Sequence, residues 1–258
     1  MRNTILFVTV ILMLIAVPVV FSANIWHDDF SSAQMNASYV TSNGGNGVNP
    51  PKWVQEGGVM KQTEPKPGDP TYIAIEVSKD ISFCGQLVRI RFDQWEDHDR
   101  SRAGVGFWLD PADKYNGYTT VIHNSLVSGN YMFLNDARAW DNDHVVNFDI
   151  GKAGVWFWMR TEIDAAATTV NSKCWLGDLK DEPKDWMLKT DYTKYGGVRN
   201  PSKLVGLNGG AGTAAELAPS TASFDDWYVY DVGGAVTAAV DQSGKLSVTW
   251  GMIKNVPF

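Results

Sequence analysis

Apolar and polar residues alternate with a period of two along most of the chain, which is typical of β-strands that bury one face. Before the last 26 residues, no segment repeats its apolar positions every 3.6 residues, as a helix would. Turn-forming Gly, Pro, Asn and Asp separate the runs. Strands are therefore predicted at 24–30, 59–63, 72–77, 87–95, 103–109, 118–123, 131–135, 144–148, 203–207, 224–231 and 245–250, with a hairpin of two strands beginning at 155.

About a dozen short strands with turns between them predict an all-β fold, a two-sheet antiparallel β-sandwich of the jelly-roll kind. Aromatic residues make up 12% of the chain and Gly occurs 24 times, which favours strands and turns over helices. We predict a single sandwich domain over 23–232 and a C-terminal tail at 233–258.

Residues 1–22 have the layout of a secretory signal peptide. Arg2 supplies a positive charge, residues 5–21 are almost continuously apolar, and the small residues Ser22 and Ala23 follow. The alternative is a retained membrane anchor, although Pro18 interrupts the end of the run. We therefore expect a protein that is secreted or at the cell surface, with no membrane association after the signal is cleaved. The net charge of −7 makes nucleic acid an unfavourable partner.

The chain contains two cysteines, Cys84 and Cys174, both in strand-like segments. In an exported protein they could form a disulfide, provided that their strands are neighbours. The alternative is two small buried side chains.

Tryptophan and arginine recur on the strand faces opposite the apolar ones. Flat aromatic rings accept the apolar face of a sugar, and charged groups bond its hydroxyls. The alternative is that these rings pack beneath loops. The predicted ligand-binding residues are Arg89, Arg91, Trp95, Trp108, Trp156, Trp158 and Arg160.

Two carboxylates stand among aromatic residues on faces that should be apolar. Asp28 lies in the first predicted strand, and Asp226 lies in the last strand before the tail. If the ends of the chain pair, the two could bind a structural Ca²⁺. The alternative is that each aspartate accepts backbone N–H bonds at a strand end.

Six segments of the chain share a pattern of order and spacing. They are IWHDDF at 25–30, WVQEGGVMKQT at 53–63, AGVGFWLDP at 103–111, YMFLNDARAW at 131–140, KCWLGDLKDEPKDW at 173–186 and SFDDWYVYD at 223–231. Together these segments resemble the concanavalin A-like, laminin-G-like jelly rolls of secreted bacterial proteins. The resemblance implies the β-sandwich fold over nearly the whole mature chain, but members of that superfamily include carbohydrate binders, glycoside hydrolases and adhesion modules.

The tripeptide Glu162-Ile163-Asp164 resembles the strand motif of laminarinase-type glycoside hydrolases, in which a second Glu follows shortly and acts as the acid/base. Here alanines and a threonine occupy 165–168, so the proton donor that retaining hydrolysis needs is missing. We therefore predict no catalytic residue. The sequence favours a non-catalytic module that binds carbohydrate or an extracellular protein. Its alternatives are a hydrolase with an atypical acid/base pair and a component of a cell-surface assembly.

Overall fold

The structure is a computed structural model. It describes residues 24–42, 52–63, 71–77, 80–94, 102–113, 116–125, 129–135, 146–150, 152–194, 198, 200–210 and 221–232. The predicted signal peptide, Trp95, the predicted strand at 245–250 and the tail lie outside the described residues.

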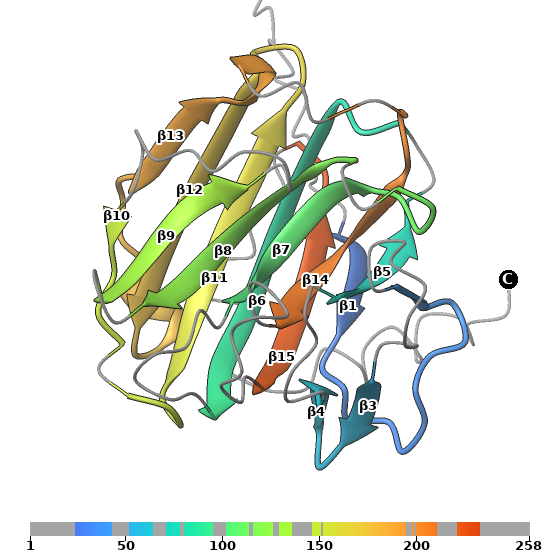
Figure 1. Cartoon of the computed structure of the whole chain (residues 1–258), viewed down its shortest axis with the longest axis vertical. Coiled ribbons are helices and arrows are strands. Elements are labelled where there is room, and N and C mark those ends of the chain that lie inside the picture. Colours follow the sequence, from blue (N-terminus) through green and yellow to red (C-terminus); the bar gives the residue numbers. More distant parts are fainter. Residues whose placement is uncertain are drawn as a thin grey trace, which may run out of the picture.

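Two antiparallel sheets stack face to face (Figure 1), which confirms the predicted β-sandwich. Sheet A has the order β13-β12-β11-β6-β15-β4-β3, with β1 also paired to β15. Sheet B has the order β10-β9-β8-β7-β14-β5-β2. The strands of sheet A are β1 (Asn24–Asp28), β3 (Trp53–Glu56), β4 (Val59–Gln62), β6 (Phe83–Gln94), β11 (Trp156–Asp164), β12 (Thr169–Leu176), β13 (Leu188–Asp191) and β15 (Thr221–Tyr230). Those of sheet B are β2 (Val40–Ser42), β5 (Thr71–Glu76), β7 (Arg102–Leu109), β8 (Tyr118–Ser125), β9 (Gly129–Asn135), β10 (Val146–Asn147) and β14 (Leu204–Gly210).

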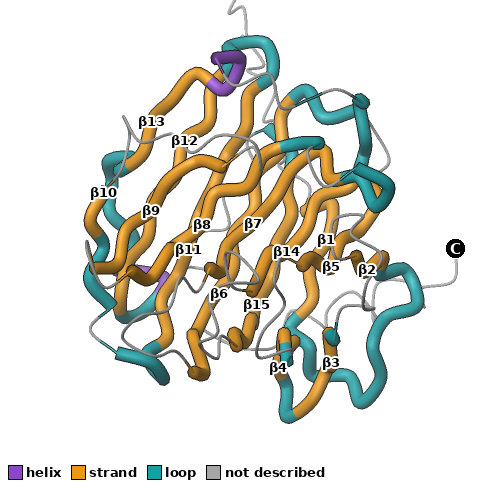
Figure 2. The backbone as a smooth tube through the Cα atoms, in the orientation of Figure 1, coloured by secondary structure: helices purple, strands orange, loops and turns teal. Residues whose placement is uncertain are grey.

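The sequence prediction missed three strands, β2, β3 and β13. Each has only three or four residues, which is too few for an alternating pattern to stand out. Among the described residues the helical segments are two 3₁₀ turns, Leu179–Asp181 and Tyr192–Lys194 (Figure 2). In the same part of the chain, no helix has the length and apolar character that crossing a membrane requires.

The core lies between the sheets and follows the alternation of the sequence. In β6 the side chains of Val88, Ile90 and Phe92 are completely buried in it. Arg89 and Arg91, between them, are only partly buried on the opposite side of sheet A. The outer face of sheet A therefore carries the polar side of the pattern, as the sequence predicts.

The predicted disulfide is wrong, because Cys84 and Cys174 are both free and buried. Cys84 in β6 pairs with Ile163 of β11, and Cys174 in β12 pairs with Met159 of the same strand. The whole of β11 thus separates the two thiols, and they are also offset along it by four residues. At about 4.8 Å per strand and 3.4 Å per residue, this separation far exceeds the roughly 7 Å between Cα atoms that a disulfide can span.

Candidate functional site

Trp108 belongs to the core, so its prediction as a ligand-binding residue is wrong. Its side chain is 5% exposed and packs against the rings of Tyr118 and Tyr192, with centroids 6.2 and 5.4 Å away. The cause is a β-bulge: Leu204 of β14 pairs with Leu109 and Val205 with Phe107, so Trp108 has no partner and takes a φ of +53°. This extra residue reverses the alternation and turns the indole inward.

Trp158 points to the outer face of sheet A, as predicted, but it is also buried. It stacks on Trp175 at 6.2 Å with an angle of 16° between the planes. Leu179, from the 3₁₀ turn of the acidic loop at 177–187, completes this outer cluster. The loop after β12 therefore covers Trp158, so this ring packs beneath a loop and does not face a ligand.

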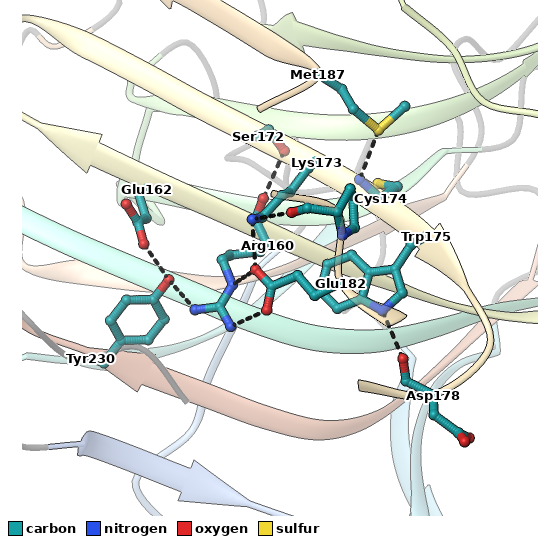
Figure 3. Close-up of polar contacts among 11 residues, drawn as sticks. Arg160, Glu162, Ser172, Lys173, Cys174, Trp175, Asp178, Glu182, Met187 and Tyr230 are labelled. Carbon is teal, nitrogen blue, oxygen red and sulfur yellow. Dashed lines mark hydrogen bonds and ion pairs between the residues drawn. The ribbon is translucent and has the colours of Figure 1, made fainter. Parts of the chain in front are cut away.

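Arg160 lies on the same outer face, 3% exposed, and holds the acidic loop (Figure 3). Its guanidinium forms a two-pronged ion pair with Glu182, with Nε–Oε1 and Nη2–Oε2 distances of 2.7 and 2.8 Å. Lys173 reaches the same carboxylate at 2.7 Å and donates to the carbonyl of Pro183 at 2.8 Å. Arg160 is thus an anchor for the loop and is not available to a ligand.

Glu162, the first carboxylate of the hydrolase-like tripeptide, faces the outer side of sheet A. It accepts a hydrogen bond of 2.8 Å from Tyr230 Oη, which in turn accepts one of 3.1 Å from Arg160 (Figure 3). The structure brings a second carboxylate, Glu182, to the far side of Arg160, but two cations neutralise it. Both of its oxygens are engaged by Arg160 and Lys173. Asp164 accepts bonds from the backbone N–H groups of the following turn.

Three of the predicted ligand-binding residues do come together on an open part of sheet A. Trp156 is half-buried, and the guanidiniums of Arg89 and Arg91 lie over its ring, 5.0 and 4.6 Å from the centroid. The register explains the arrangement, because Trp156 is directly opposite Arg91 and Trp158 opposite Arg89. We call these three residues the Trp156 patch.

Two carboxylates and a hydroxyl border the Trp156 patch. Asp93 pairs with Arg91 at 2.6 Å, and both contact the hydroxyl of Ser223 in β15. Asp225 lies 3.8 Å from Arg89. The patch therefore offers an aromatic ring, cationic donors and anionic acceptors within one partly exposed surface.

Burial, followed by the negative charge of Asp226, raises the pKa of Asp225 to about 6, although Arg89 opposes the shift. A carboxyl with a raised folded pKa destabilises the folded state once it must ionise. For Asp225 this loss of stability develops as pH rises from its unfolded pKa of 3.8 to its folded pKa of about 6. We expect Asp225→Asn to raise the free energy of unfolding by about 1 kcal/mol near pH 8, after allowance for solvent screening, and by nothing below about pH 4. Urea unfolding across this range measures the effect. Asp80→Asn, at a 95% exposed carboxylate, is the control that should show no such gain.

The residues at the predicted calcium site do not fit the ion. Asp28 pairs with Trp227, so it does lie beside Asp226. However, its carboxylate already accepts the N–H of Phe30 and the hydroxyl of Tyr39, each at 2.7 Å. Asp226 sits in a bulge with a φ of +48°. No group of three metal-ligating side chains occurs among the described residues. Asp28 instead fits the alternative prediction, in which an aspartate accepts a backbone N–H bond at the end of a strand.

The sequence reasoning missed a second polar group, on the outer face of sheet B. Tyr72, Arg102, His123 and Asn208 come from four strands, β5, β7, β8 and β14, and each is at most 6% exposed. They lie far apart in the sequence, and only their registers bring them to one face. The signal that could have found them is a polar residue on the face opposite the core in each strand.

No protein-family model matches the chain, and no curated protein matches it. Solved structures do. The potassium-bound carbohydrate recognition domain of Emp46p has a TM-score of 0.54 at 11% identity, over 81% of this chain and 96% of that one. Lectin I-B4 from Griffonia simplicifolia has a TM-score of 0.55 at 7% identity, over 80% and 99%. Bacteroides ovatus Xyloglucan PUL GH43B has a TM-score of 0.55 at 12% identity, over 81% of this chain but only 39% of that one.

At these identities the likeness concerns the fold alone. The aligned region covers most of this chain, and the shared fold agrees with the two stacked antiparallel sheets and with the resemblance of the six sequence segments. The chain therefore has a concanavalin A-like jelly-roll fold, which it shares with the Emp46p carbohydrate recognition domain and with lectin I-B4.

Proposed function

We propose that this protein is a non-catalytic carbohydrate-binding module and that the Trp156 patch is its binding surface. The observation that carries the proposal is the half-buried indole of Trp156, held against two arginines on the outer face of a sheet. The part of the indole that the two guanidiniums leave uncovered is suited to the C–H groups on the apolar face of a sugar.

The groups around the ring are suited to the hydroxyls of the same sugar. Arg89 and Arg91 donate hydrogen bonds, and the carboxylates of Asp93 and Asp225 accept them. These side chains are 22–37% exposed, so a ligand can reach them without unfolding any strand. The carbohydrate-binding neighbours of the fold agree with this reading.

A glycan-array screen, followed by calorimetric titration of the strongest binder, tests the proposal. We expect Trp156→Ala to weaken the affinity about 5- to 150-fold, since one stacked ring contributes about 1–3 kcal/mol. Val54→Ala is the matched control, because it truncates a 38% exposed apolar side chain in β3, at the far edge of the same sheet. Equal affinities for wild type and Trp156→Ala would remove the patch from the site.

Export of the protein is part of the proposal. It rests on the signal-peptide pattern of residues 1–22, and it places the module outside the cell or on its surface. The test is amino-terminal sequencing of the protein recovered from the medium and from the cell envelope. A mature chain that begins near Ala23 is expected, and a chain that retains residues 1–22 would favour an anchor.

A further inference from the structure

One straight row of residues crosses the outer face of sheet A. Trp156 of β11 is directly opposite Arg91 of β6, and Arg91 is directly opposite Ser223 of β15. Ser223 is in turn directly opposite Lys61 of β4. Because directly opposite residues have their Cβ atoms about 4.5–5.5 Å apart, the row is about 15 Å long. The Trp156 patch is therefore one end of a longer surface, which we call the Trp156–Lys61 row.

Side chains along the row are reachable from solvent. Trp156 is half-buried, and the side chains of Arg91 and Lys61 are 30% and 29% exposed. Ser223 is buried, but its hydroxyl supports the groups above it, since it donates to Asp93 and accepts from Arg91 at 3.4 Å. The side chain of Asp93 is itself 26% exposed. A ligand that lies along the row can therefore contact both ends and the middle.

The far end of the row supplies a donor and an acceptor. Lys61 Nζ lies 3.3 Å from Glu56 Oε2, and the Glu56 side chain is 71% exposed. An ammonium group has three N–H donors and a carboxylate has about four acceptor sites, so this contact leaves most of both available to a ligand. The row ends here, because Val54, the partner of Lys61 in β3, offers no side-chain hydrogen bond.

The neighbouring row, through Trp158, is not suited to a ligand in the same way. Trp158 is directly opposite Arg89, and Arg89 is directly opposite Asp225. However, Trp158 is 4% exposed and lies beneath the acidic loop, so a ligand would meet no aromatic ring at the start of this row. The exposure of the two tryptophans therefore favours the row through Trp156.

The chemistry of the row defines the ligand. The indole at one end is suited to the C–H face of a sugar, and the charged side chains further along are suited to hydroxyls. A single sugar ring is too short to reach from one end to the other, whereas about three linked units span about 15 Å. Asp93 and Glu56 would repel an acidic sugar, which favours a neutral one. A straight row also favours an extended β-1,4-linked chain over a curved α-1,4-linked one.

We infer that the Trp156–Lys61 row binds a neutral, extended β-1,4-linked oligosaccharide that runs across the strands of sheet A. One sugar unit stacks on Trp156, and the unit at the other end forms hydrogen bonds with Lys61 and Glu56. The inference rests on the proposed function, because the Trp156 patch is one end of the row. It adds the class of ligand, the direction in which the ligand lies and a second point of contact.

NMR titration with oligosaccharides of increasing length tests the inference. The probes are the β-1,4-linked di-, tri- and tetrasaccharides of glucose, mannose and xylose, with α-1,4-linked maltotriose for comparison. In at least one of the three β-1,4-linked series we expect the trisaccharide to bind about tenfold more tightly than the disaccharide, and more tightly than maltotriose. Tenfold is the gain expected from a further hydrogen bond to a charged group.

Variants of Lys61 show whether the gain comes from the far end of the row. Lys61→Ala should remove the gain between disaccharide and trisaccharide and leave the disaccharide affinity unchanged. Lys61→Arg keeps a cationic donor and should retain much of the gain. Lys203→Ala is the matched control, because it removes a 40% exposed lysine with one carboxylate 3.8 Å away, next to β14 of sheet B. All three variants should melt within about 2 °C of the wild type, since exposed ion pairs contribute little to stability.

The outcomes distinguish this inference from the proposed function. The inference is overturned if none of the β-1,4-linked series binds, if the affinity does not rise from disaccharide to trisaccharide, or if Lys61→Ala keeps the whole rise. In each of these cases the patch still stands as the binding site if Trp156→Ala weakens binding of a sugar found on the glycan array. If Trp156→Ala leaves all sugar binding unchanged, the proposed function fails and this inference fails with it.

Discussion

Trp108→Ala should unfold far more easily than the wild type, by about 3–5 kcal/mol, because a large core aromatic leaves a cavity behind. The indole is 5% exposed and contacts Tyr118 and Tyr192, and the hydroxyl of Tyr118 is itself bonded to the carbonyl of Tyr192 at 2.6 Å. For a chain of this size the loss corresponds to a fall in Tm of roughly 10 °C. Chemical denaturation and a thermal melt both measure it.

The matched variant is Trp156→Ala, which removes the same side chain from a half-buried position on the outer face. It should cost no more than about 1.5 kcal/mol, since much of the ring is already in water. Equal melting temperatures for the two variants would show that Trp108 is not in the core and would reopen its role in binding.

The second large effect is expected for Glu182→Ala, which removes the carboxylate that two buried cations share. Arg160 is 3% exposed and the side chain of Lys173 is 8% exposed, and both pair with this one carboxylate. Breaking a buried ion pair by removing one partner destabilises a protein by about 3–5 kcal/mol. The acidic loop should also detach from sheet A, which proteolysis within 177–187 would detect.

Glu56→Ala is the control, because it removes an ion pair of similar length, 3.3 Å to Lys61, whose carboxylate is 71% exposed. That loss should stay below about 0.5 kcal/mol. If Glu182→Ala is as mild as Glu56→Ala, then the Arg160 network does not hold the loop, and the burial of Trp158 needs another explanation.

The sequence predicted the fold because the alternation of β6 and β11 is intact over many residues. Val88, Ile90 and Phe92 face the core, and Arg89 and Arg91 face outward, as their positions require. Alternation is a local property of a strand, and a residue's neighbours in sequence are enough to reveal it.

The site was harder to predict, because exposure depends on what lies above a strand. Trp158 and Arg160 point outward as expected, yet a loop that begins at Gly177 covers both. The prediction that Trp108 faces outward is wrong for a different reason. The bulge that turns it inward depends on the partner strand, which lies almost a hundred residues later in the chain. Asn208 and Tyr72 are directly opposite each other only because of the register between β5 and β14, which the sequence alone does not reveal.

The separation of Cys84 and Cys174 by a complete strand has a consequence for biogenesis. Burial raises the pKa of both thiols, to about 12 for Cys84, so neither supplies the thiolate that oxidants and exchange enzymes attack. The chain contains no third cysteine. Its native state can therefore form without an oxidoreductase and should tolerate strong reductant, which leaves the maturation of this fold independent of the redox chemistry of whichever compartment receives it.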